Sequence, residues 1–192
     1  MLKIGAIAVR AILIASGAIV LGLSSGLAKH QRVESVPAVT SFSAFVGGFG
    51  LVVTALGLLS LWIEKFPTVL VLVADALSAV FYIAGGIALT LALKSVSSCS
   101  PDNEQATAER FYNKILNGGC EEIDGIQYCY VGGGDPNEDL TPGRCKRARS
   151  DNVFEYVGFV FAIGIIVITY LFEVEGIRRK TLLFLSPSDD KE

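Results

Sequence analysis

Four cysteines carry the clearest chemistry in this chain, and all of them lie in one polar segment, residues 94–152: Cys99, Cys120, Cys129 and Cys145. An even number of cysteines gathered in one polar segment is typical of two disulfides formed in an oxidising compartment. Four cysteines allow three pairings, and their spacing does not choose among them. A zinc site is the alternative, but the close Cys-x-x-Cys pairs and the nearby histidine of zinc sites are missing. We therefore expect disulfides, with no metal and no cofactor.

Two charged residues inside apolar stretches form the second candidate site. Arg10 and Asp75 each lie six residues into such a stretch, which corresponds to a depth of about 9 Å along a helix. A charge at membrane depth costs at least ~2.5 kcal/mol on insertion scales, and an opposite charge offsets part of that cost. We therefore expect Arg10 and Asp75 to pair on facing helices. The alternative is that Arg10 reaches the lipid headgroups while Asp75 bonds locally to Ser78 or Tyr82.

Groups for catalysis are scarce. Glu155 lies one turn into the last apolar stretch, where we expect an interfacial acid that reaches water or Lys94, far from Asp75. The chain has one histidine, His30, and lacks a Cys-x-x-Cys pair and a Gly-x-Ser-x-Gly motif. We therefore do not expect an enzyme. The net charge of −3, without a basic stripe interleaved with aromatics, also excludes a nucleic-acid partner.

The elements that must position these residues are four apolar stretches, residues 4–27, 42–62, 69–93 and 153–172. Each is long enough for a membrane-spanning helix, which needs about 20 apolar residues. A composition that is 52% hydrophobic agrees with this interpretation. We predict an all-α transmembrane four-helix bundle over residues 1–175, followed by a cytosolic tail over residues 176–192. The first stretch is longer than a signal-peptide core of about 7–15 residues, so we expect an uncleaved helix.

With four spans, both termini lie on one side of the membrane. Because disulfides form outside the cytosol, we expect the loop over residues 94–152 to be extracellular and both termini cytosolic. Lys3 agrees with the positive-inside rule, whereas Lys29 and Arg32 oppose it. The three basic residues after the last span also agree with the rule, and we predict that they contact inner-leaflet lipids: Arg178, Arg179 and Lys180. An ordinary positive flank of the last span is the alternative.

The long loop has its own structural signals. Apolar residues recur at roughly helical spacing over residues 101–116, which predicts a short helix. Residues 118–130 predict a small hairpin closed by Cys120 and Cys129, with Asp124-Gly125 as its turn.

Small residues at four-residue spacing recur in every span. Helices in lipid associate through close packing of such residues, so we expect them at the helix contacts. The predicted packing residues are Ala18, Gly22, Gly26, Ala44, Gly48, Ala84, Ala88, Gly158 and Ala162.

A family resemblance rests on the third and fourth spans and the loop ends beside them. Residues 75–89 run from Asp75 through a Phe- and Gly/Ala-rich stretch towards Ser98-Cys99, and Arg144-Cys145 precedes the aromatic start Phe154-Glu155-Tyr156. This pattern resembles the fungal MARVEL-domain membrane proteins, in particular the non-classical export protein group. The resemblance implies a disulfide between Cys99 and Cys145. Cys120 would then bond Cys129 within an insert that the shorter-loop relatives lack.

The resemblance implies organisation of membrane rather than catalysis. Such proteins are associated with plasma-membrane microdomains, eisosome-type furrows and vesicle or export traffic. The expected partners are membrane lipids, with sphingolipid or sterol as candidates, and other integral membrane proteins or further copies of the chain. An accessory subunit of a transporter or pump is the second interpretation, and an oligomeric channel or transporter is the third.

Overall fold

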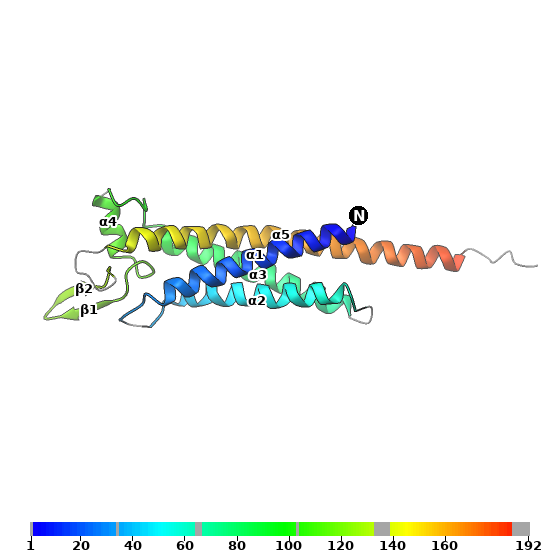
Figure 1. Ribbon diagram of the computed structural model, residues 1–192, viewed down its shortest axis with the longest axis horizontal. Helices are drawn as coiled ribbons and strands as arrows, with labels where there is room; N and C mark the ends of the chain where they lie inside the picture. The colour runs from blue at the N-terminus through cyan, green and yellow to red at the C-terminus, as the bar shows by residue number, and fades with distance from the viewer. Residues whose placement is uncertain (1, 34, 64–66, 103, 133–138, 186–192) are drawn as a thin grey trace, which may run out of the picture.

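The computed structural model describes residues 2–33, 35–63, 67–102, 104–132 and 139–185. Four long helices form a bundle: α1 (Leu2–Ala28), α2 (Ala38–Ser60), α3 (Thr68–Leu93) and α5 (Thr141–Leu185) (Figure 1). These four, among the described helices, are long and apolar enough to cross a membrane. The predicted fold class, a transmembrane four-helix bundle, is confirmed.

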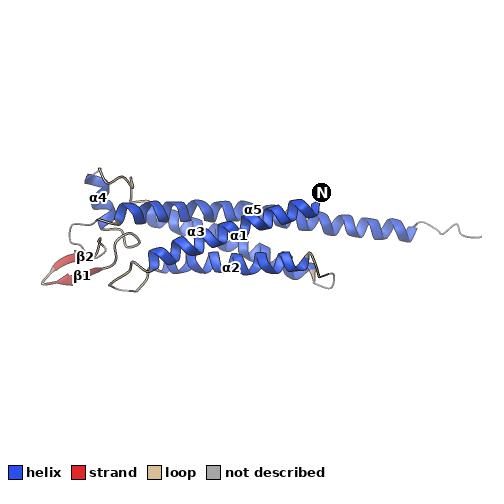
Figure 2. Ribbon diagram, viewed as in Figure 1, coloured by secondary structure: helices blue, strands red, loops and turns tan. Residues whose placement is uncertain are grey.

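The described residues between α3 and α5, 94–102, 104–132 and 139–140, lie at one end of the bundle, and we call them the cap. It contains α4 (Glu104–Phe111) and an antiparallel hairpin of β1 (Cys120–Ile123) and β2 (Ile126–Cys129), at the end opposite the N-terminus (Figure 2). Asp124 (φ 54°) and Gly125 (φ 77°) make the turn, as a two-residue hairpin loop requires. The short helix and the hairpin predicted for this segment are both confirmed.

The boundaries of α5 differ from the predicted ones. The helix begins at Thr141, so residues 141–152 are helical and the connecting loop is shorter than expected. Pro142 suits a first helical turn, and Lys146, Arg147, Ala148 and Arg149 are good helix formers. These residues are mostly charged, so they form no apolar run that would reveal the start of the helix. At the other end α5 continues to Leu185, so the predicted tail begins as helix. Residues 186–192 lie outside the described part.

Buried residues recur at alternating steps of three and four along each long helix. This is the seam of a left-handed bundle, in which the same stripe of each helix faces its neighbours. Along α1 and α2 the stripe is Ala6, Arg10, Leu13, Gly17, Val20, Ser24 and Leu27, then Thr40, Ser43, Gly47, Gly50, Thr54 and Gly57. Polar side chains and glycines therefore share the interior of the bundle.

Several predicted packing residues lie outside these seams. Ala18 and Gly22 are exposed, and a β-carbon added at Gly22, Gly26 or Gly48 would meet no described atom within 4 Å. Four-residue spacing shows that small residues lie on one side of a helix, but it does not show which way that side faces. In α1 the side that faces the bundle is the one that buries Arg10, so the side with Ala18 and Gly22 faces outwards. The other predicted positions are half-buried or buried: Ala44, Ala84, Ala88, Gly158 and Ala162.

Gly47 makes the close helix contact that was predicted for its neighbour Gly48. A β-carbon at Gly47 would lie 2.6 Å from the backbone nitrogen of Leu21 and 2.8 Å from the carbonyl oxygen of Gly17. Backbone atoms cannot rotate away, so α1 and α2 would have to separate.

We therefore expect Gly47→Ala to lower the free energy of unfolding by about 1–3 kcal/mol, the usual cost of overpacking. Gly48→Ala is the matched control and should cost less than about 0.5 kcal/mol. Denaturation of the two purified variants in mixed micelles measures this difference. Equal losses would show that α1 and α2 do not meet at Gly47.

Candidate functional site

Two disulfides fix the cap. Cys99 bonds Cys145 and ties the segment after α3 to the first turns of α5, with both residues buried. Cys120 bonds Cys129 across the ends of the hairpin. All four cysteines are therefore bonded, in the pairs that the resemblance implies.

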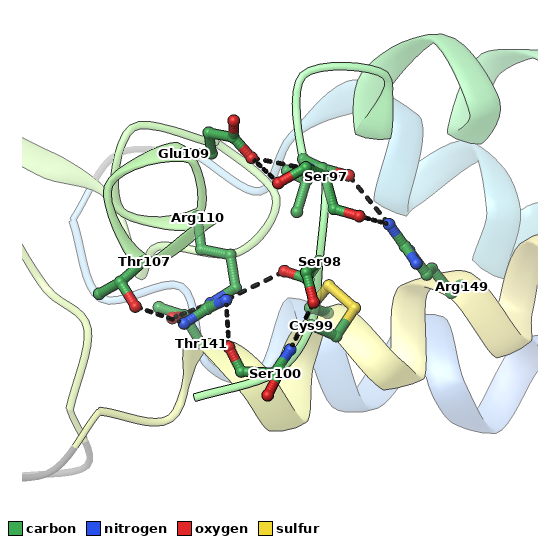
Figure 3. The surroundings of a disulfide bond; sticks show 11 residues. Ser97, Ser98, Cys99, Ser100, Thr107, Glu109, Arg110, Thr141 and Arg149 are labelled. Carbon is green, nitrogen blue, oxygen red and sulfur yellow. Dashed lines mark hydrogen bonds between the residues drawn. A yellow bond between two sulfur atoms is a disulfide. The ribbon is translucent and has the colours of Figure 1, made fainter. Parts of the chain in front are cut away.

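A buried arginine in α4 organises the backbone around the first disulfide. Arg110 is fully buried and donates hydrogen bonds to the carbonyl oxygens of Ser98 (3.0 Å) and Ser100 (2.9 Å) and to the Thr141 hydroxyl (3.2 Å) (Figure 3). Carbonyl groups flanking Cys99 are thereby satisfied by one rigid guanidinium. Sequence reasoning missed Arg110, because a charged residue in a polar loop is ordinarily solvated.

Polar contacts also hold the segment before Cys99. Glu109 accepts hydrogen bonds from the Ser97 amide (2.7 Å) and hydroxyl (2.6 Å), and these bonds hold its pKa below the usual range. Because the folded form favours the carboxylate, this contribution to stability is present near neutral pH and is lost as the pH falls. Arg149 of α5 donates to the Val96 and Ser97 carbonyls (Figure 3).

One side of the hairpin exposes three large apolar or aromatic side chains. Glu121 pairs with Tyr128 and Ile123 with Ile126, so these four residues share one side of the two strands. Ile123, Ile126 and Tyr128 are 49%, 57% and 51% exposed. We call these four residues the hairpin face. Apolar side chains gathered at the tip of a polar cap are typical of a contact surface.

Arg10 and Asp75 meet inside the bundle. The two terminal guanidinium nitrogens donate to the two carboxylate oxygens, each at 2.7 Å, and both side chains are buried. Gly57 of α2 lies against the guanidinium, and a β-carbon there would collide with it. The pair therefore joins α1, α2 and α3 at one level of the membrane.

Glu155 is not the interfacial acid that its depth predicts. Its side chain is fully buried against Gly85 of α3, and its carboxylate oxygens have no hydrogen-bond partner among the described residues. One turn earlier, the buried Asp151 accepts a hydrogen bond from Ser24 of α1. Depth along a helix does not reveal which side of the helix faces the interior, and here both acids face inward.

A cavity of about 250 Å³ lies beside Arg10, at the bundle end away from the cap. Its walls combine polar groups such as Ser60, Thr68 and Thr169 with apolar ones such as Val71 and Phe172. The described residues around it bring no set of reactive groups comparable to a catalytic site.

A comparison with protein-family models identifies the domain. The model of the MARVEL family, described as a membrane-associating domain, matches residues 3–172. The chain belongs to the MARVEL family. No curated protein and no solved structure matches it at the significance required. Four apolar helices and a membrane-associating, non-enzymatic family together make this chain an integral membrane protein.

The MARVEL domain includes the whole cap and ends before the basic segment of α5. Arg178 is exposed on the helical extension beyond the matched residues. The side chains of Arg179 and Lys180 lie outside the described part of the structure. Contact of these three residues with inner-leaflet lipid stays a prediction.

Proposed function

We propose that this MARVEL protein organises protein assemblies or microdomains in the plasma membrane, without catalysis of its own. The cap is extracellular in this proposal and both termini are cytosolic, because two disulfides persist in an oxidising compartment. Similarity to the fungal non-classical export group, seen in the residues around Asp75 and the Cys99 and Cys145 ends of the cap, supports a role in eisosome-type domains or export traffic.

The hairpin face is the observation that carries the proposal. The cap is held by two disulfides and by the buried Arg110, so Ile123, Ile126 and Tyr128 are presented on a preorganised support. A rigid apolar surface binds a partner without a large ordering cost. Lateral packing in the membrane adds a second contact, for which the exposed ring of Phe45 on α2, packed edge-on against Phe81 of α3, is available.

Crosslinking in native membranes, followed by purification in mild detergent, tests the proposal. We expect wild-type protein in oligomers or larger assemblies that contain other membrane proteins and retain lipid, including sphingolipid or sterol. Recovery of monomers alone would contradict it. One stoichiometric partner would instead identify an accessory subunit of a transporter or pump, and ion flux in reconstituted vesicles would identify a channel or transporter.

Two variants of adjacent residues make the test specific to the hairpin face. Ile126→Glu places a charge on the hairpin face, whereas Gln127→Glu places the same charge on the opposite side of β2. We expect Ile126→Glu to reduce crosslinked assemblies about tenfold, equivalent to roughly 1.4 kcal/mol of binding free energy, and Gln127→Glu to leave them unchanged. Equal yields from both variants would show that assembly does not use this surface.

A further inference from the structure

Two acidic side chains of α5 point into the bundle from one face of the helix. Asp151 and Glu155 are four residues apart, which places them one turn apart on the same side, and both are 0% exposed. Asp151 Oδ2 accepts a hydrogen bond from the Ser24 hydroxyl. Asp151 Oδ1 and both carboxylate oxygens of Glu155 have no hydrogen-bond partner in the described part of the chain. This leaves three acidic oxygens buried without a donor.

The described residues around Glu155 are polar, and none of them brings a positive charge to it. Ser43 of α2 and Tyr82 of α3 lie near Glu155, but neither hydroxyl group reaches hydrogen-bond geometry with a partner among the described residues, and both are buried. Asp151 of the same helix places a second carboxyl group one turn away, and two ionised carboxylates at this spacing would repel each other. From α1 the polar neighbour of this acidic pair is Ser24, whose hydroxyl is used by Asp151. Each of the four helices therefore contributes a polar group to this part of the interior.

The buried cations of the described long helices are engaged elsewhere. Arg144 of α5 donates to the carbonyl oxygen of Leu116, 3.0 Å away. Both terminal nitrogens of Arg10 donate to Asp75, so this guanidinium does not neutralise Glu155. An ionised carboxylate without a counter-charge is so costly in an apolar interior that such a group takes up a proton instead. A second carboxylate one turn away strengthens that preference, since two neighbouring negative charges repel each other.

We propose that Glu155 is a proton-binding site in the interior of the membrane bundle. A proton fits better than a metal ion because the carboxyl is packed against Gly85, where a β-carbon would lie 2.6 Å from Oε1. In the described part of the chain, no group of three or more His, Cys, Asp or Glu side chains could hold a metal. With the proton bound, Glu155 is a neutral acid whose O–H group can donate a hydrogen bond to the Ser43 hydroxyl.

An apolar carbodiimide, N,N′-dicyclohexylcarbodiimide, reports this state directly. It partitions into membranes and reacts with a protonated carboxyl: the acid oxygen bonds the central carbon of the reagent while the acid proton moves to a reagent nitrogen. Transfer of the acyl group from oxygen to nitrogen then gives a stable N-acylurea. No group leaves, so the labelled residue gains the mass of one whole reagent molecule.

The experiment treats the full chain in native membranes and maps the adduct by peptide mass spectrometry. We expect one adduct per chain, on Glu155, with labelling that falls about fivefold or more as the pH is raised from about 6 to about 9. Glu155→Gln, which resembles the neutral acid in shape and charge, removes the adduct. Glu173→Gln, which changes an exposed acid of the same helix, leaves it in place.

Three outcomes would overturn the proposal. Labelling of Glu155 could be no greater at about pH 6 than at about pH 9. The adduct could form on Asp151 instead, or a water-soluble carbodiimide could label Glu155 as fast as the apolar reagent. Mapping in the wild-type chain decides among these outcomes even if a variant fails to fold.

Discussion

We expect Arg10→Met alone to lower the free energy of unfolding by about 3–5 kcal/mol, because it leaves the Asp75 carboxylate buried and unpaired. Asp75→Leu alone costs a similar amount, since the guanidinium then lies in the bundle without a counter-charge. The double variant regains most of the loss, because two apolar side chains replace two charges. Unfolding of the purified protein in mixed micelles, over a series of denaturing-detergent fractions, gives the four values required.

The control for this cycle is Arg178→Met, which removes an exposed charge from α5 and should change stability by less than about 0.5 kcal/mol. Losses that simply add in the double variant would show that Arg10 and Asp75 do not interact. In that case the bundle would need another explanation for two charges that lie at membrane depth.

We expect removal of the Cys99–Cys145 disulfide to have the second large effect on stability. The bond spans 46 residues, and the chain-entropy model assigns roughly 4 kcal/mol to a loop of that size. The Cys120–Cys129 bond spans 9 residues and is worth roughly 2.6 kcal/mol in the same model. We therefore expect the paired serine variant at positions 99 and 145 to be the less stable one, and to release α4 from α5 as well.

Thermal unfolding of the two paired variants in detergent compares these bonds directly. Protection of the cap from proteolysis gives a second readout, since loss of the Cys99 bond also exposes the backbone that Arg110 binds. A hairpin variant that is less stable than the variant lacking the Cys99–Cys145 bond would contradict this ranking.

The sequence specifies the bundle because lipid imposes strict rules on it. About 20 apolar residues are needed to cross the membrane, and two opposite charges at equal depth are costly unless they meet. The length requirement predicts the four spans. The cost of a buried charge favours the pairing of Arg10 with Asp75. The hairpin can also be predicted from the sequence, because Asp124-Gly125 is a strong turn signal between two short strands.

What the sequence did not reveal is the rotation of each helix about its axis. Glu155 was expected near water, and Gly22 at a helix contact, yet Glu155 is buried and Gly22 is exposed. In the structure, the buried stripe through Arg10 and Gly17, with its three- and four-residue steps, defines the rotation of α1. This stripe can be identified only from the packing of all four helices. Arg110 was missed for a related reason. Its partners include backbone carbonyl groups, which every residue has, so no residue type in the sequence indicates the contact.

The central claim is a bundle that crosses the membrane four times and carries a disulfide-bonded cap on its non-cytoplasmic side. Labelling of cysteines in intact cells with a membrane-impermeant maleimide, before and after an impermeant reductant, tests it most directly. We predict no labelling before reduction and labelling of the cap cysteines afterwards. Cysteines that are free from the start, and that react only when the cells are permeabilised, would place the cap in the cytosol and contradict the account.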